Sequence, residues 1–393
     1  MNNNKHIPQG YKDSPLGIIP KEWKVKKVLD FAPLQRGFDL PTDKIVKGKY
    51  PVVYSNGILN YHDEYKAKGP GVVTGRSGTI GKVTYVESDY WPHNTSLWVT
   101  DFKGNSPKYV YYVYKYMGLS KFASGSGVPT LNRNDVHVSK IAIPPIEEQC
   151  HIVKVLELWD TAIEKQSELI EKLKLRKRAL MQQLLTGKKR LPRFSGEWEH
   201  IKLGDIAERV TRKNEEDNKN VVTISAQRGF VVQTDFFNKS VASETLDNYY
   251  LVHKDEFCYN KSYSNGYPMG AIKRLTAFDK AVVTTLYICF KLKKSSNINI
   301  DFFEQYCESG IFNKELVKVA NEGGRAHGLL NVTPSDFFNM HMGIPSIEEQ
   351  NAIATVLVNA DKEIELANKK LDNLQSQKRG LMQQLLTGRK RVV

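Results

Sequence analysis

The chain is poor in the features that mark secreted, metal-binding or membrane proteins. Only four cysteines occur in 393 residues, and none of them belongs to a C-x-x-C pair or has a histidine at zinc-ligand spacing. No run of 18 apolar residues is present, and the first residues, M-N-N-N-K-H, lack the apolar centre of a signal peptide. These absences predict a protein of the cytoplasm whose thiols are free.

Motifs of common catalytic sites are also missing. The sequence contains no G-x-G-x-x-G in a βαβ unit, no G-x-S-x-G, no H-E-x-x-H and no acidic-Pro-Pro-aromatic tetrapeptide of amino-methyltransferases. The stretch from Gly75 to Val83 resembles a phosphate loop, but it has five residues instead of four before Gly81 and a valine where Ser or Thr would hold magnesium. We therefore expect no catalytic residue, no metal site and no cofactor in this chain, and we favour a binding protein over an enzyme.

Positive charge is abundant. Lys and Arg number 57 against 43 Asp and Glu, which gives a formal net charge of +14. Such an excess favours a polyanionic partner, and nucleic acid comes before a membrane because no membrane segment is visible. A protein that is basic without binding nucleic acid is the alternative.

One long motif occurs twice. I-P-P-I-E-E-Q begins at Ile143 and L-M-Q-Q-L-L-T-G ends at Gly187; I-P-S-I-E-E-Q and L-M-Q-Q-L-L-T-G recur at Ile344 and up to Gly388, each 201 residues further along. A fixed period without insertion indicates two copies of one structural plan. In both copies two glutamates lie in the expected first helical turn, a glycine supplies a left-handed stop, and a basic tail follows.

Between these motifs, apolar residues alternate at steps of four and three, which predicts a coiled-coil helix. The first seam comprises Ile152, Leu156, Trp159, Ile163, Gln166, Ile170, Leu173, Lys177, Leu180 and Leu184, and the second comprises Ile353, Leu357, Ala360, Ile364, Ala367, Leu371, Leu374, Lys378, Leu381 and Leu385. An amphipathic helix lying on a single core is the alternative. About 40 residues at 1.5 Å per residue would make a rod of roughly 60 Å, which exceeds one domain core. Ser346 and Glu349 are expected to form a capping box.

A globular module precedes each helix. The stretch from Glu22 to Asp30 resembles that from Glu197 to Asp205, and both modules contain short β-prone runs followed by a helical segment. We predict small α+β modules at 1–145 and 188–345 that alternate with helices at 146–187 and 346–393. Because the second module would start where the first helix ends, the two helices are expected to pair in antiparallel orientation.

This arrangement resembles the specificity subunit of type I restriction-modification systems, and the resemblance covers the whole chain. It implies a non-catalytic scaffold in which two target-recognition domains each read half of a bipartite DNA site and the paired helices set their separation. It also implies partners: modification subunits that bind S-adenosylmethionine and methylate adenine, and restriction subunits that use ATP and Mg. A methylation-only or single-chain system without a separate restriction subunit is the alternative within this family.

Two readings from other classes remain open. A self-contained nuclease or methyltransferase would act on DNA alone, and a pure coiled-coil adaptor would show no DNA preference even with partners present.

Candidate DNA contacts come from loops of the modules, where Arg suits phosphate and Asn, Gln and Ser suit base edges. In the first module they are Arg36, Phe38, Tyr54, Ser55, Asn56, Arg76, Ser77, Thr79, Asn132, Arg133 and Asn134. In the second they are Thr211, Arg212, Lys213, Gln227, Arg228, Asn260, Lys261, Ser262, Tyr263, Arg325 and His327. Candidate contacts to partner subunits are the repeated residues at the helix ends, Glu147, Glu148, Gln149, Met181, Gln182, Gln183, Glu348, Glu349, Gln350, Met382, Gln383 and Gln384.

Overall fold

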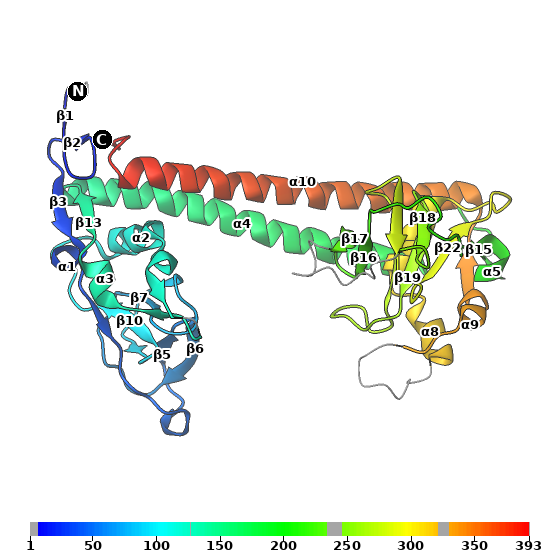
Figure 1. Cartoon of the computed structure of the whole chain (residues 1–393), viewed down its shortest axis with the longest axis horizontal. Coiled ribbons are helices and arrows are strands. Elements are labelled where there is room, and N and C mark those ends of the chain that lie inside the picture. The colour runs from blue at the N-terminus through cyan, green and yellow to red at the C-terminus, as the bar shows by residue number, and fades with distance from the viewer. Residues whose placement is uncertain (1–6, 126, 234–245, 321–329, 393) are drawn as a thin grey trace. The chain divides into compact units, whose positions relative to one another are not determined.

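The computed structural model describes residues 7–125, 127–233, 246–320 and 330–392. The chain divides into two compact units: unit 1 contains Met1–Ser167 and Lys369–Val393, and unit 2 contains Glu168–Asn368. Two long helices, α4 (Ile146–Leu184) and α10 (Ile347–Leu386), each contribute one part to unit 1 and the other part to unit 2 (Figure 1). Within the described residues, no helix has the length and apolar character needed to cross a membrane.

The module of unit 1 is built on a four-stranded antiparallel sheet, in the order β4-β10-β7-β8, and a three-stranded sheet, in the order β6-β5-β9. Its strands are β1 (Tyr11–Lys12), β2 (Ile19–Pro20), β3 (Lys24–Lys27), β4 (Leu34–Arg36), β5 (Tyr50–Tyr54), β6 (Gly57–His62), β7 (Gly71–Gly75), β8 (Val83–Val86), β9 (Trp91–Pro92), β10 (Ser96–Val99), β11 (Ala123–Ser124), β12 (Thr130–Leu131) and β13 (Lys140–Ile143). Its helices are α1 (Val28–Phe31), η1 (Thr42–Lys44), α2 (Pro107–Met117), η2 (Leu119–Phe122) and α3 (Arg133–His137). The strands β3 and β13 pair just before α4 begins.

The module of unit 2 has a four-stranded sheet in the order β15-β22-β19-β20, with two further strand pairs, β16-β17 and β18-β21. Its strands are β14 (Glu199–Lys202), β15 (Ala207–Arg209), β16 (Val222–Ser225), β17 (Gly229–Val232), β18 (Tyr250–His253), β19 (Phe257–Asn260), β20 (Ala271–Arg274), β21 (Lys280–Val283), β22 (Ile288–Leu292) and β23 (His341–Ile344). Its helices are α5 (Leu203–Ile206), α7 (Ile300–Glu308), α8 (Asn313–Val319) and α9 (Pro334–Phe338). The strands β14 and β23 pair just before α10 begins, as β3 and β13 do before α4.

The two modules therefore repeat one α+β plan, which confirms the predicted fold class. In unit 2, the segment from Ala281 to Phe290 contains the end of β21 and the start of β22, and α7 and α8 follow one another up to Val319. In unit 1, α2 stops at Gly118, whose φ of 61° is left-handed.

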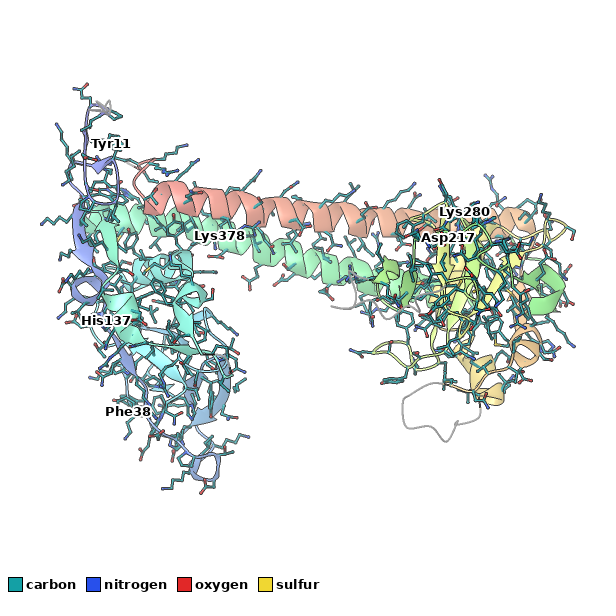
Figure 2. All side chains as sticks on the ribbon, viewed as in Figure 1. Tyr11, Phe38, His137, Asp217, Lys280 and Lys378 are labelled. Atoms are coloured by element: carbon teal, nitrogen blue, oxygen red, sulfur yellow. The ribbon has the colours of Figure 1, made fainter. Side chains whose placement is uncertain are left out.

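The long helices pair in antiparallel orientation within each unit, as predicted. In unit 1, Asp160 of α4 binds Lys378 of α10, and in unit 2, Asp361 of α10 binds Lys177 of α4 at 2.6 Å. Asp361 and Lys378 each lie 201 residues after their counterparts, so the same ion pair is built twice with the helices exchanged. The seam residues of both copies are buried or half-buried, and Lys378 lies between α10 and the first part of α4 (Figure 2).

Each module shares its hydrophobic core with the helices. In unit 1, Ile152 and Leu156 of α4 and Met382 of α10 belong to the same buried cluster as the module residues Trp23 and Phe31. In unit 2, the equivalent helix residues Met181, Leu184, Ile353 and Leu357 pack with Phe302. Because apolar burial is the main stabilising force in folding, module and helices of one unit are expected to fold together.

The helix ends follow the sequence prediction with one correction. Gly187 and Gly388 have φ angles of 67° and 70°, so both supply the left-handed stop. The Ser346 hydroxyl oxygen accepts the backbone N–H of Glu349 at 3.4 Å, which is half of the expected capping box. The Glu349 carboxylate instead accepts hydrogen bonds from Arg190, because that guanidinium comes close enough to bind both of its oxygens.

Candidate nucleic-acid interface

Three predicted arginines of unit 1 meet at one hollow of about 310 Å³. Arg36 is the last residue of β4, Arg76 follows the last residue of β7, and Arg133 is the first residue of α3. Thr130 and Asn132 line the same hollow. We call this set the arginine hollow: Arg36, Arg76, Thr130, Asn132 and Arg133. It joins residues that are up to 97 positions apart in the sequence.

Backbone hydrogen bonds fix the segment that carries Arg76. The Arg76 N–H donates to the Thr95 carbonyl at 2.8 Å, and the Arg76 carbonyl accepts the N–H of Leu131 at 2.7 Å. Arg76 Nε donates to the Asn94 carbonyl at 3.1 Å, which orients the guanidinium group. Its position therefore depends on the sheet and on β12.

A buried histidine supports the strand that ends in Arg36. His137 Nε2 accepts the backbone N–H of Leu34 at 2.8 Å, and the side chain lies in the interior of unit 1 (Figure 2). Burial lowers the pKa of His137, and the nearby Arg133 charge lowers it further. The neutral imidazole that this bond requires is thus the favoured form.

The other predicted residues of unit 1 differ in how far they are buried. Phe38 packs its ring against Trp98 with 6.2 Å between the ring centroids, and Tyr54 packs against His93 at 4.3 Å, so both are half-buried. Ser55 and Ser77 are half-buried; the Ser55 N–H donates to the Thr95 hydroxyl at 3.4 Å, and Ser77 forms a β-bridge with Thr130. The exposed members of the set are Asn56, Thr79 and Asn134.

In unit 2, two loops that carry predicted residues are joined to each other. Gln227 Nε2 donates to the Asn265 carbonyl at 2.8 Å, and Asn260 Nδ2 donates to the Ile224 carbonyl at 3.0 Å. The Ser262 N–H donates to Asn260 Oδ1 at 3.0 Å. The structure thus brings together the predicted residues Gln227, Arg228, Asn260, Lys261, Ser262 and Tyr263. Tyr263 is 65% exposed, so its ring is available for contact.

Two predicted cations of unit 2 also form hydrogen bonds within the module. Arg212 donates to both carboxylate oxygens of the buried Glu256, at 3.0 and 3.3 Å, and to the Leu251 carbonyl at 2.9 Å. Lys213 donates to the Asn248 carbonyl at 2.7 Å. These bonds connect segments of the module. Arg212 is half-buried and Lys213 is exposed, so their contact with DNA stays a prediction. Thr211 is exposed, whereas Arg325 and His327 lie outside the described residues.

One cation was missed by the sequence reasoning. Arg209 is the last residue of β15, as Arg36 is the last residue of β4, and each pairs with the strand next to it in the equivalent sheet. Arg209 is exposed. Burial of Lys261 lowers the pKa of its amine, and the nearby Arg209 charge lowers it further. The only signal in the sequence was the similarity of the two modules, which matches Asp30 with Asp205. Because β15 begins two residues earlier than this match implies, the match does not place Arg209 opposite Arg36.

The predicted partner contacts divide into buried and exposed residues in the same way in both copies. Glu148, Gln149, Met181, Glu349, Gln350 and Met382 are buried. Glu147, Gln182, Gln183, Glu348, Gln383 and Gln384 are exposed. The buried members therefore cannot form a free surface, which corrects that part of the prediction.

The buried E-E-Q residues instead connect each module to the helices. Gln149 Oε1 accepts the N–H of Ser106, the residue that caps α2, at 3.0 Å, and Gln350 Oε1 accepts the N–H of Asn299, which caps α7, at 2.9 Å. The Glu148 carboxylate accepts a hydrogen bond from Arg391 at 2.9 Å. Glu349 binds Arg190 in the same way. The motif thus positions module and helix relative to each other inside one unit.

The comparison with known protein families decides the assignment. The family model described as "Type I restriction modification DNA specificity domain" matches residues 20–175 and again 195–376. This chain belongs to that family. It is a type I specificity subunit, and its two matched regions each contain one module and most of the long helix that follows it.

Related proteins agree with this assignment. The specificity subunit of the type I restriction enzyme MjaVIII from Methanocaldococcus jannaschii is 25% identical over 299 residues, which cover 70% of this chain and 67% of that protein. A putative specificity subunit of the MjaX enzyme from the same organism is 25% identical and covers 98% of this chain and 97% of its own length. The crystal structure of an S subunit from M. genitalium shares the fold, with a TM-score of 0.55, 16% identity, and 93% and 96% of the two chains covered.

Proposed function

We propose that this specificity subunit recognises a bipartite DNA sequence, with one half read by the module of unit 1 and the other by the module of unit 2. The chain itself would supply recognition and assembly, and the chemistry would be performed by partner subunits. Modification subunits would bind S-adenosylmethionine and methylate adenine. Restriction subunits would supply ATP-dependent activity where the system includes them.

The repeated ion pair carries this proposal. Asp160 accepts a hydrogen bond from Tyr112 of α2 at 2.7 Å while it binds Lys378, and Asp361 accepts one from Gln305 of α7 at 2.8 Å while it binds Lys177. The same ion pair therefore joins the helices in both units, and each aspartate also binds a module side chain, although that side chain is Tyr112 in unit 1 and Gln305 in unit 2. The loop residues of the modules differ, which is what two different half-sites would require.

The long helices support a scaffolding role. Both run from one unit into the other without a break, so they can set the separation of the half-sites. The exposed glutamines at their C-terminal ends, Gln182 and Gln183 in one copy and Gln383 and Gln384 in the other, offer the same surface twice. Two copies of one modification subunit would fit this repetition.

Methylome sequencing tests the proposal. Adenine methylation should be mapped in the host genome with the gene intact, with the gene deleted, and with the deletion complemented. We expect one bipartite motif to lose its methylation on deletion and to regain it on complementation. A continuous motif, or a methylome that does not change, would contradict bipartite recognition.

A further inference from the structure

The arginine hollow concentrates positive charge without matching negative charge. Its arginines come from three separate segments, and among the described residues only Arg36 forms an ion pair, with Asp39 at 3.4 Å. The side chains of Arg36 and Asp39 are 52% and 71% exposed, so this pair contributes little and can be exchanged for another anion. Asn94 Nδ2 also donates to Asp39, which leaves that carboxylate shared.

The polar groups around the hollow are mainly hydrogen-bond donors. The guanidinium groups have no acceptor lone pairs, and Asn132 uses its Oδ1 to accept the N–H of Asn134 at 3.0 Å. The Asn132 amide nitrogen has no acceptor in the described part of the chain. Thr130 donates its hydroxyl to the Ser124 carbonyl at 3.4 Å, so its oxygen can still accept a bond. A ligand that fits this set must be rich in acceptors and negatively charged.

Base edges fit this set less well than a phosphate does. Adenine and cytosine present amino donors in the major groove, and those donors would find no acceptor among the three guanidinium groups. Guanine presents two acceptors, but one arginine is enough to bind them both. Three guanidinium groups at one hollow repel each other unless an anion lies between them, and a phosphodiester supplies both the charge and several oxygens.

We propose that the arginine hollow binds a phosphodiester group of the DNA backbone and adds affinity without reading sequence. This inference rests on the proposed function, because it names the part of the DNA that this site contacts. Base recognition by the module of unit 1 then belongs to other residues around it, among which Asn56, Thr79 and Asn134 are exposed.

The test uses the full chain assembled with its modification subunits and a duplex that carries its methylated motif. The variants are Arg36→Gln and Arg133→Gln, since both side chains are exposed. Arg133 has no side-chain hydrogen bond among the described residues, and the one bond that Arg36 loses is its exposed contact with Asp39 at 3.4 Å. Lys154→Gln, at an exposed position of α4, is the control for the loss of one charge. Arg36→Lys and Arg133→Lys keep the charge.

The affinity is measured between 50 and 200 mM salt, for the target and for a duplex with an altered half-site. Each lost phosphate contact lowers the slope of log affinity against log salt by about 0.9, so the fall in affinity over this range shrinks about 3.5-fold per contact. We expect both Gln variants to show this change equally on both duplexes. The Lys variants and Lys154→Gln should keep the slope of the unaltered protein.

A neutral methylphosphonate linkage locates the contact. Substituted at the phosphate that the hollow binds, it should weaken the unaltered protein and should not weaken Arg133→Gln further. A Gln variant with an unchanged slope, or one whose methylated motif changes at a base position, overturns the phosphate assignment. In either case the unaltered complex would still recognise its bipartite motif, so the outcome is distinct from failure of the proposed function.

Discussion

Lys378 provides the sharpest test of how the helix pair is held. Its side chain is 6% exposed and its ammonium group binds Asp160, which is 40% exposed and also bonded to Tyr112. Burial lowers the pKa of Lys378, although the bond to Asp160 opposes that shift. Replacement by methionine keeps the apolar stem and removes the charge, so Lys378→Met isolates the ion pair.

The expected cost follows from the burial of the partner. Removing one member of a fully buried ion pair costs about 3–5 kcal/mol, because the other charge is left in an apolar environment. Asp160 is partly exposed and retains Tyr112, so water can replace much of the lost interaction. We expect the opening free energy of α10 in unit 1 to fall by about 1–2 kcal/mol.

Native-state hydrogen exchange on peptides from α10 measures this opening locally, which is needed because a chain of two units does not unfold as one. A double-mutant cycle with Asp160→Asn isolates the coupling between the two side chains. The Lys177 and Asp361 pair of unit 2 is a matched internal control, and its single variants should act on unit 2 by a similar amount. A coupling energy near zero in both cycles would refute the claim that these ion pairs stabilise the helix pair.

Three further predictions follow from the structure. Burial lowers the pKa of His137, so the unfolded state binds more protons than the folded state as pH falls below about 6.5. Urea unfolding of unit 1 should therefore occur more easily at pH 5 than at pH 7.5. The variant His137→Gln should reduce this pH dependence, and an equal dependence in both proteins would contradict the prediction. Inserting one heptad after Glu168 and one after Lys369 keeps each lysine–aspartate pair inside its own unit and lengthens each helix by about 10 Å. The methylated half-sites should then move apart by about 3 base pairs, and unchanged spacing in an active variant would refute the spacer role. Native mass spectrometry of the complex should show two modification subunits per chain, and a saturated one-to-one complex would contradict the partner surface inferred from the repeated glutamines.

The helices could be predicted from the sequence because their determinants are local. The heptad steps and the glycine stops lie within two continuous stretches that repeat after 201 residues. The structure confirms the left-handed conformation predicted for Gly187 and Gly388. The antiparallel pairing followed from connectivity. The strand order of the modules is non-local and could not be read from short β-prone runs.

The roles of single side chains were predicted less well, because they depend on distant residues. Glu148 and Gln149 looked like a surface motif, but Arg391 and Ser106 come from far along the chain to bind them in the interior. Arg212 has no acidic neighbour in the sequence, but in the fold it binds Glu256, a buried acid 44 residues away. Arg36, Arg76 and Arg133 were each predicted, but only folding places them at one hollow.

The central claim, that each module reads its own half-site, is tested most directly by exchanging one module. The segment from Arg193 to Gly343 should be replaced by the matching module of another specificity subunit, which leaves α4 and α10 and both lysine–aspartate pairs unchanged. Methylome sequencing of a host that carries the active chimera is the measurement. The account predicts a methylated motif in which one half is new and the other half is the original. A motif in which both halves change together would contradict it.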